Sequence, residues 1–191
     1  MKVSIRSVLN LIFSRFFETK RLHSEAIVMR TYETIVAAAR QPVLYSQWNV
    51  PDTALGRFES LSLHMILFLH RTSHASESTK ALAQEVVEEF FKDVDHSLRE
   101  LGIADAGVPK RMKKLAKMFY GRAASYDASI NENDRVAMGA ALLRNVRPDV
   151  AEWPNAENLA DHVFSVSHAL AQLSDGDIEA GDLWFLLPSI S

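Results

Sequence analysis

Apolar residues recur at helical spacing along most of the chain, and no segment keeps the alternation of a half-buried strand. Near the start, one face of a possible helix collects the following apolar side chains: Ile5, Val8, Leu9, Ile12, Phe13 and Phe16. Further helices are expected at about 24–40, from Asp52 or Thr53 to about Arg71, from after Ser78 to a stop at Gly102, from Pro109 onward, at about 132–146, and from about 156 to Leu173 with a stop near Gly176. The pattern predicts an all-α fold, a single-domain bundle of about seven helices with a short apolar C-terminal tail.

The helices differ in how much of their surface is apolar. The one that Asp52 or Thr53 can cap and that runs to about Arg71 is apolar on most sides, as a buried central helix is. Before it, residues 43–52 have the proline and aromatic content of an ordered loop. We divide the chain into a basic amphipathic N-terminal helix (1–23), a helical domain (24–175) and a C-terminal tail (176–191).

Composition and motifs favour a binding protein over an enzyme. The chain has 191 residues, of which 48% are hydrophobic, and it has no cysteine, which excludes disulfides, thiolate zinc sites and a catalytic thiol. It has no glycine-rich phosphate loop, nucleophile elbow or dinucleotide fingerprint. His70 and His74 are spaced like two metal ligands, but the helix is expected to end there. We therefore predict no catalytic site, no metal and no cofactor.

Residues 109–122, "PKRMKKLAKMFYGR", hold six basic side chains and no acidic one in a chain of net charge -3. Those six residues are Lys110, Arg111, Lys113, Lys114, Lys117 and Arg122. On a helix the lysines lie opposite an apolar arc, so the segment is either a solvated face or a contact surface. Unrelieved like charges three and four residues apart favour an anionic partner: nucleic-acid phosphate, an acidic protein or lipid headgroups.

Three blocks of the chain strongly resemble the ubiquinol–cytochrome c chaperone family. They are "QPVLYSQWNVPDTALGRFESLSLHMILFLHR" (41–71), "EEFFKDVDHSLRELGI" (88–103) and "GVPKRMKKLAKMFYGRAASYDAS" (107–129). The resemblance implies a non-enzymatic assembly factor of the cytochrome bc1 complex that binds newly made cytochrome b or an early intermediate. It implies a peripheral position at the inner membrane, on the cytoplasmic side in a bacterium or the matrix side in a mitochondrion. A ribosome, an anionic membrane surface and a small partner subunit are further expected partners.

For the apolar parts of such a client we predict a groove lined by Tyr45, Trp48 and Phe58. The alternative for Trp48 is that it only pins its loop onto the core. Arg57 and Glu59 are assigned to structural hydrogen bonding. We expect three histidines to be buried or half-buried and hydrogen-bonded, namely His64, His162 and His168. The rival function is a peripheral lipid- or RNA-binding module that has no protein client.

Overall fold

The computed structural model describes residues 24–183. The predicted amphipathic helix at 1–23 and the part of the predicted tail at 184–191 lie outside the described residues.

The described part of the chain is all-α, as predicted, and contains no strand. Residues 24–39 are helical. They are followed by α2 (Pro42–Ser46), α3 (Ala54–Thr72), α4 (Glu77–Glu100), α5 (Val108–Asn131), α6 (Arg135–Val146), α7 (Ala156–Ala171) and α8 (Asp175–Glu179).

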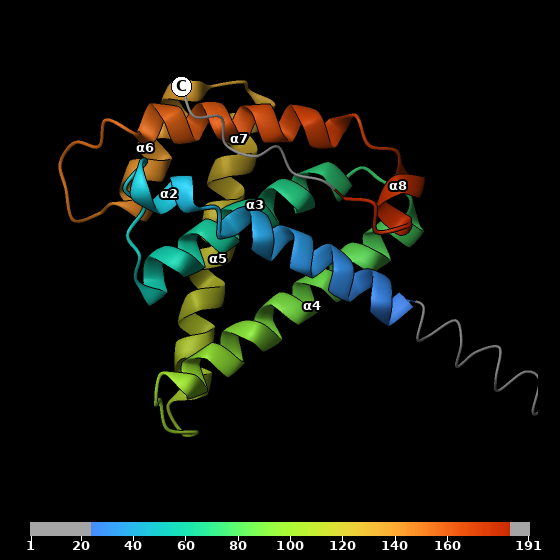
Figure 1. Cartoon of the computed structure of the whole chain (residues 1–191), viewed down its shortest axis with the longest axis horizontal. Helices are drawn as coiled ribbons and strands as arrows, with labels where there is room; N and C mark the ends of the chain where they lie inside the picture. Colours follow the sequence, from blue (N-terminus) through green and yellow to red (C-terminus); the bar gives the residue numbers. More distant parts are fainter. Residues whose placement is uncertain (1–23, 184–191) are drawn as a thin grey trace, which may run out of the picture.

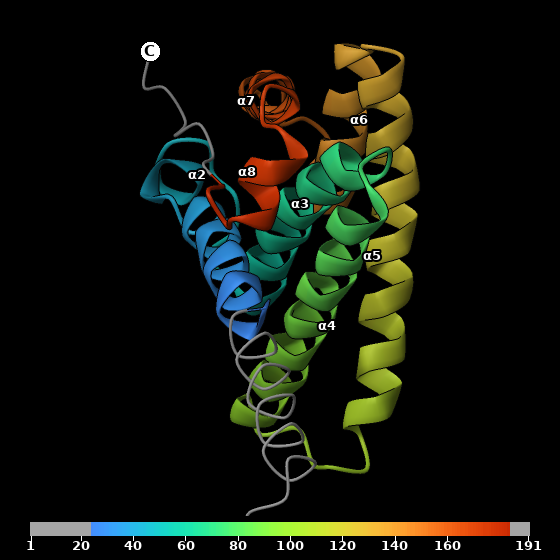
Figure 2. The same ribbon diagram turned by 90° about the vertical axis from the view of Figure 1, so that its right-hand side faces the viewer.

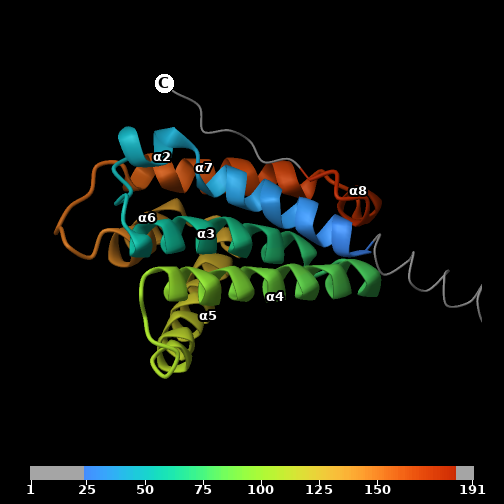
Figure 3. The same cartoon turned by 60° about the horizontal axis from the view of Figure 1, so that its bottom comes forward.

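Helix α3 is the centre of the fold. It packs against α4, α5, α6 and α7 (Figure 1), and Figure 3 shows helix 24–39 lying along its remaining side. Its fully buried side chains include Met65, Leu67 and Phe68. The prediction of a buried central helix is confirmed. Thr53 caps this helix, since its hydroxyl oxygen accepts the Gly56 N–H at 3.1 Å.

Helices α4 and α5 form a long hairpin. Figures 1 and 2 both show the connection between them at the far end of this hairpin, away from α6 and α7. The tertiary contacts that α5 makes with α3 and α6 hold the other end of the hairpin in the body of the molecule.

Two short helices fall where the sequence predicts other structure. Residues 43–52 were expected in a loop, but 43–46 belong to α2, which Pro42 begins because its fixed φ suits the first turn of a helix. The helix expected from about 156 to Leu173 ends at Ala171, and Gly176, the expected stop, lies inside α8. Helix α8 is set by a capping box in which Ser174 and Asp177 bond to each other's backbone.

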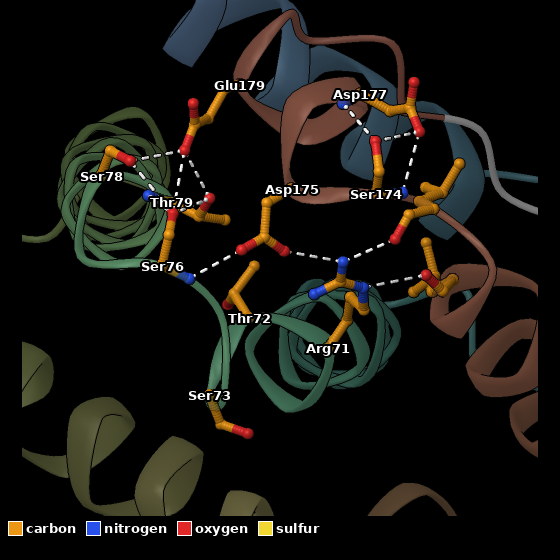
Figure 4. Close-up of polar contacts among 12 residues, drawn as sticks. Arg71, Thr72, Ser73, Ser76, Ser78, Thr79, Ser174, Asp175, Asp177 and Glu179 are labelled. Atoms are coloured by element: carbon orange, nitrogen blue, oxygen red, sulfur yellow. Dashed lines mark hydrogen bonds and ion pairs between the residues drawn. The ribbon is translucent and has the colours of Figure 1, made fainter.

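Arg71, at the end of α3, ties three helices together (Figure 4). Its guanidinium donates hydrogen bonds to the carbonyl oxygens of Leu170 (3.2 Å) and Leu173 at the end of α7. It also donates to Asp175 Oδ1 of α8 at 2.9 Å. Orphan carbonyls at the C-terminus of a helix favour a cation, so this contact stabilises α7 as well as α8.

The carboxylates of α8 in turn cover the start of α4 (Figure 4). Glu179 Oε1 accepts from the hydroxyls of Ser76, Ser78 and Thr79 at 3.0, 2.6 and 2.7 Å. Asp175 Oδ2 accepts the backbone N–H of Ser76 at 2.7 Å, and this bond is the main reason that the pKa of Asp175 lies below its usual value. Negative charge at a helix N-terminus is favourable, so α8 is locked onto α4.

Substitution of Gly56 tests how tightly the start of α3 packs against the Pro51 backbone. A Cβ at this position would lie 1.9 Å from the backbone oxygen of Pro51. We expect Gly56→Ala to lower the free energy of unfolding by about 1–3 kcal/mol, because backbone atoms must move apart. The control is Gly121→Ala on the exposed side of α5, where a Cβ would meet nothing within 4 Å. There, alanine should stabilise by up to about 1 kcal/mol. Urea unfolding measures both, and equal effects would show that α3 is loosely seated.

Candidate functional site

Helix α5 presents a row of exposed cations. Its apolar side is anchored by the buried rings of Phe119 and Tyr126, which fixes the rotation of the helix. The opposite side exposes five basic residues, which we call the α5 basic row: Lys110, Arg111, Lys113, Lys114 and Lys117. The amphipathic pattern predicted for this segment is therefore present in the folded molecule.

The α5 basic row carries no internal counter-charge in the described structure. No ion pair within residues 24–183 involves any of its five members, whereas Lys80 and Lys92 of α4 each pair with a glutamate of their own helix. A row of like charges three and four residues apart is mildly unfavourable when left alone. The row is thus chemically available to an anionic partner, and its role in binding stays a prediction.

Arg122 does not belong to this row, which corrects the assignment of six basic residues to one surface. Its Nη2 donates to Glu59 Oε1 of α3 at 2.6 Å, its Nε donates to the other carboxylate oxygen, and its Nη1 donates to the Met118 carbonyl. The Arg122 side chain is 14% exposed and that of Glu59 is 1% exposed. Burial raises the pKa of Glu59, and the guanidinium partly opposes that rise. Arg122 is held inward because this buried carboxylate needs a partner.

The predicted groove of Tyr45, Trp48 and Phe58 is not formed, because two of its three members are in the core. Trp48 and Phe58 are each 8% exposed. The ring of Trp48 lies 5.5 Å from that of His162, and its carbonyl oxygen accepts the indole N–H of Trp153 at 2.9 Å. The alternative interpretation, that Trp48 pins its segment onto the core, is the one that fits.

Tyr45 alone stays near the surface, half-buried, with its hydroxyl donating to the Ala39 carbonyl at 2.8 Å. It borders an open depression lined by Arg40, Pro42, Tyr45, Ser46, Asp52 and Arg57. Two of these side chains are already occupied, since Arg57 Nε donates to Asp52 Oδ1 at 2.6 Å.

A second depression, between α4 and α5, contains the aromatic surface that sequence reasoning missed. It is lined by Gln84, Val87, Glu88, Phe91, Lys92, Asp95 and Tyr120. The rings of Phe91 and Tyr120 are 6.4 Å apart, and Tyr120 is 60% exposed. One signal could have found it: Tyr120 follows Lys117 by three residues, which places its ring on the lysine side of α5. Apolar surface and unpaired cations therefore adjoin on this helix.

Two histidines lie deep in the core between α3 and α7. His64 is 1% exposed and His162 is 7% exposed, and their ring centroids are 5.9 Å apart. The Ser60 carbonyl lies 2.8 Å from His64 Nδ1, whereas His162 Nε2 has no hydrogen-bond partner among the described residues. Burial lowers the pKa of His64 to about 4 and that of His162 to about 3, the latter with a small contribution from His64. His168 is exposed, so its predicted burial was wrong.

The arrangement contains no evident metal-binding chemistry. Within residues 24–183 no cluster of three or more potential His, Asp or Glu ligands is arranged to hold a metal ion. His70 Nδ1 instead lies 2.7 Å from Asp127 Oδ1, while His74 is exposed at the end of α3. None of the described helices combines the length and the apolar composition that crossing a bilayer requires.

Comparison with known proteins places this geometry in a family. Residues 46–185 match the family model described as Ubiquinol-cytochrome C chaperone. The chain belongs to this family. The match runs from the last residue of α2 past the end of α8, so it includes the whole α4–α5 hairpin and the α5 basic row.

Two relatives illustrate the family. The crystal structure of the Cbp3 homolog from Brucella abortus has 54% sequence identity and a TM-score of 0.85, and the match covers 91% of this chain and 96% of that one. The mouse protein named Ubiquinol-cytochrome c reductase complex assembly factor 1 is 24% identical over 151 residues, or 78% of this chain. The matched part is 51% of the mouse protein, so the chain spans about half the length of that relative.

The two kinds of cation on α5 can be told apart by substitution in this family member. Arg122→Ala should lower the free energy of unfolding by about 3–5 kcal/mol, because it leaves the buried Glu59 carboxylate without its partner. Lys117→Ala, on the exposed row, should change it by less than about 0.5 kcal/mol. The double variant Glu59→Gln/Arg122→Met should recover part of the loss in denaturant titrations. No recovery would show that the charge of Glu59 is not the cause.

The buried histidines predict acid sensitivity. Their pKa values in the fold, about 4 and 3, lie below the ordinary 6.5, so the unfolded chain binds more protons in this interval. The free energy of unfolding should be constant above pH 6.5 and fall as the pH drops toward 4, by up to about 1.4 kcal/mol per pH unit for each histidine. His162→Leu should make this slope shallower, and the exposed-site control His168→Gln should not. An unchanged slope in His162→Leu would contradict the assignment.

Proposed function

We propose that this protein is an assembly chaperone of the cytochrome bc1 complex, which binds newly made cytochrome b or an early intermediate that contains it. The observation that carries the proposal is membership of the ubiquinol–cytochrome c chaperone family over residues 46–185. The mouse relative is named as a reductase complex assembly factor, which supports the same process.

The geometry supports a mechanism of holding. Cytochrome b is a membrane protein, so before insertion its apolar segments need cover from water. The depression between α4 and α5 offers the aromatic rings of Phe91 and Tyr120 among polar and charged side chains, and in this proposal it replaces the groove that we expected around Trp48. Aromatic rings with a polar end suit surfaces that are partly wet and partly apolar. No covalent step or cofactor is part of this proposal.

The α5 basic row would supply the second contact, to an anionic surface near the place where the client is made. Five cations without a counter-charge among residues 24–183 give long-range attraction that depends on salt. In this proposal the protein acts at the face of the membrane where cytochrome b is synthesised, cytoplasmic in a bacterium and matrix-facing in a mitochondrion. A ribosome or a small partner subunit could share the same surface.

The same row also suits a second function, a peripheral lipid- or RNA-binding module without a protein client. It predicts attachment to an anionic surface but no selective contact with an apolar polypeptide segment. Whether the depression on α4 and α5 is used therefore separates the two functions.

Affinity purification of the tagged chain from detergent-solubilised membranes tests the proposal. We expect cytochrome b to co-purify, and we expect Lys113→Glu/Lys114→Glu/Lys117→Glu to reduce its recovery several-fold at low salt and by less at higher salt, where the charges are screened. The triple variant should keep its unfolding free energy, since these side chains point away from the core. Arg144→Glu, at an exposed position of α6, is the matched control and should bind normally. Absence of cytochrome b from the wild-type eluate, with lipid or RNA retained, would favour the second function.

A further inference from the structure

The end of the α4–α5 hairpin has a fixed conformation. The Gly102 N–H bonds to the Arg99 carbonyl at 2.9 Å, and the Ile103 N–H reaches back to the Leu98 carbonyl at 3.2 Å. Gly102 has φ 78, in the left-handed region that glycine tolerates. This pair of bonds is a Schellman motif, which typically brings the residue after the glycine against the last buried turn. The backbone therefore directs Leu101 outward.

Leu101 is 61% exposed, although leucine is the kind of side chain that a fold usually covers. It lies where α4 ends, at the part of the hairpin that projects from the body in Figures 1 and 2. A leucine held outward by a rigid turn, at the extremity of the molecule, is placed to meet an apolar environment outside the protein.

The carboxylates near this turn are largely neutralised. Arg99 Nε donates to Asp95 Oδ2 at 2.7 Å, and its Nη1 donates to Asp105 across the turn. Glu100 Oε1 lies 3.1 Å from the imidazole of His96. Segment 95–117 as a whole holds six Lys or Arg and three Asp or Glu residues, in a chain of net charge -3. The hairpin end is thus the cationic pole of an otherwise acidic molecule.

We propose that the end of the α4–α5 hairpin docks onto an anionic lipid bilayer, with Leu101 entering the interface and the α5 basic row contacting the headgroups. Lys110 and Lys117 are seven residues apart, or about 10 Å along the helix, which is comparable to the screening length at moderate salt. All five cations of the α5 basic row can therefore be attracted electrostatically by the charged membrane surface while the turn contacts it. This deepens the proposed function by naming the anionic surface, and it rests on that function for the place of action.

An aliphatic residue at the turn favours lipid over nucleic acid. In RNA, the phosphates bind cations and the bases stack on aromatic rings, but neither interacts favourably with an exposed leucine. At a membrane interface, cations bind the anionic headgroups and aliphatic side chains insert below them, so both are favourable.

A probe at residue 101 tests the proposal directly. Because the chain has no cysteine, Leu101→Cys can be labelled at this site alone with an environment-sensitive dye. Vesicles containing 30% phosphatidylglycerol should shift its emission to the blue, and pure phosphatidylcholine vesicles should not. The control is Leu55→Cys, since Leu55 is 49% exposed but lies in the first turn of α3. Binding without a shift at 101, or with equal shifts at both sites, would overturn the docking geometry.

Charge reversal tests the proposed contact between the α5 basic row and the lipid headgroups. In vesicle flotation of the full chain, each headgroup-contacting cation should contribute roughly fivefold to partitioning, so Lys113→Glu/Lys114→Glu should weaken it at least about 30-fold. Arg144→Glu should match the wild type. A variant that floats normally, or a chain that binds single-stranded RNA in preference to anionic vesicles, would overturn the proposal. Failure of the wild-type chain to bind anionic vesicles, with cytochrome b still recovered, would refute this inference alone, whereas normal docking without cytochrome b would refute the chaperone function.

Discussion

The fold depends on burying most of α3 among the other helices. A buried charge on such a helix needs a partner within the fold, because it has lost its contact with water. Among the described residues, Glu59 is paired with Arg122 of α5. His64 contacts the Ser60 carbonyl one turn earlier in the same helix. The ion pair fixes the rotation of α5 about its axis, together with Phe119 and Tyr126. Once that rotation is fixed, the lysines on the opposite side have to face solvent.

The same segment therefore uses its cations in two ways. Arg122 stabilises the core, since its planar guanidinium bonds both oxygens of one carboxylate. The lysines, which carry compact and strongly hydrated charges, remain at the surface without a partner in the described residues. This division explains how an acidic protein presents a basic surface: its carboxylates are engaged elsewhere, in α8 with Arg71 and α4 or at the hairpin end with Arg99.

These contacts also bear on function. The links from Arg71 through Asp175 and Glu179 join α3, α4, α7 and α8 into one body, and the Schellman motif stiffens the far end of α4. Surfaces carried on such a body need little ordering when a partner binds, which lowers the entropic cost of association. A holding chaperone that attaches to a membrane through one end of a hairpin would leave the depression beside Tyr120 open to its client.

The spacing of apolar residues was enough to predict the helical class, the central position of α3 and the two-sided character of α5, because the helical period is a local property of the chain. It did not determine α2 or α8, each of five residues, since they are shorter than two turns and depend on caps and contacts with distant segments. The local pattern also does not predict that Arg122 turns inward while the lysines face solvent, or that Trp48 and Phe58 lie in the core. Their exposure is set by Glu59, Trp153, His162 and Phe90, which only the tertiary structure brings into contact.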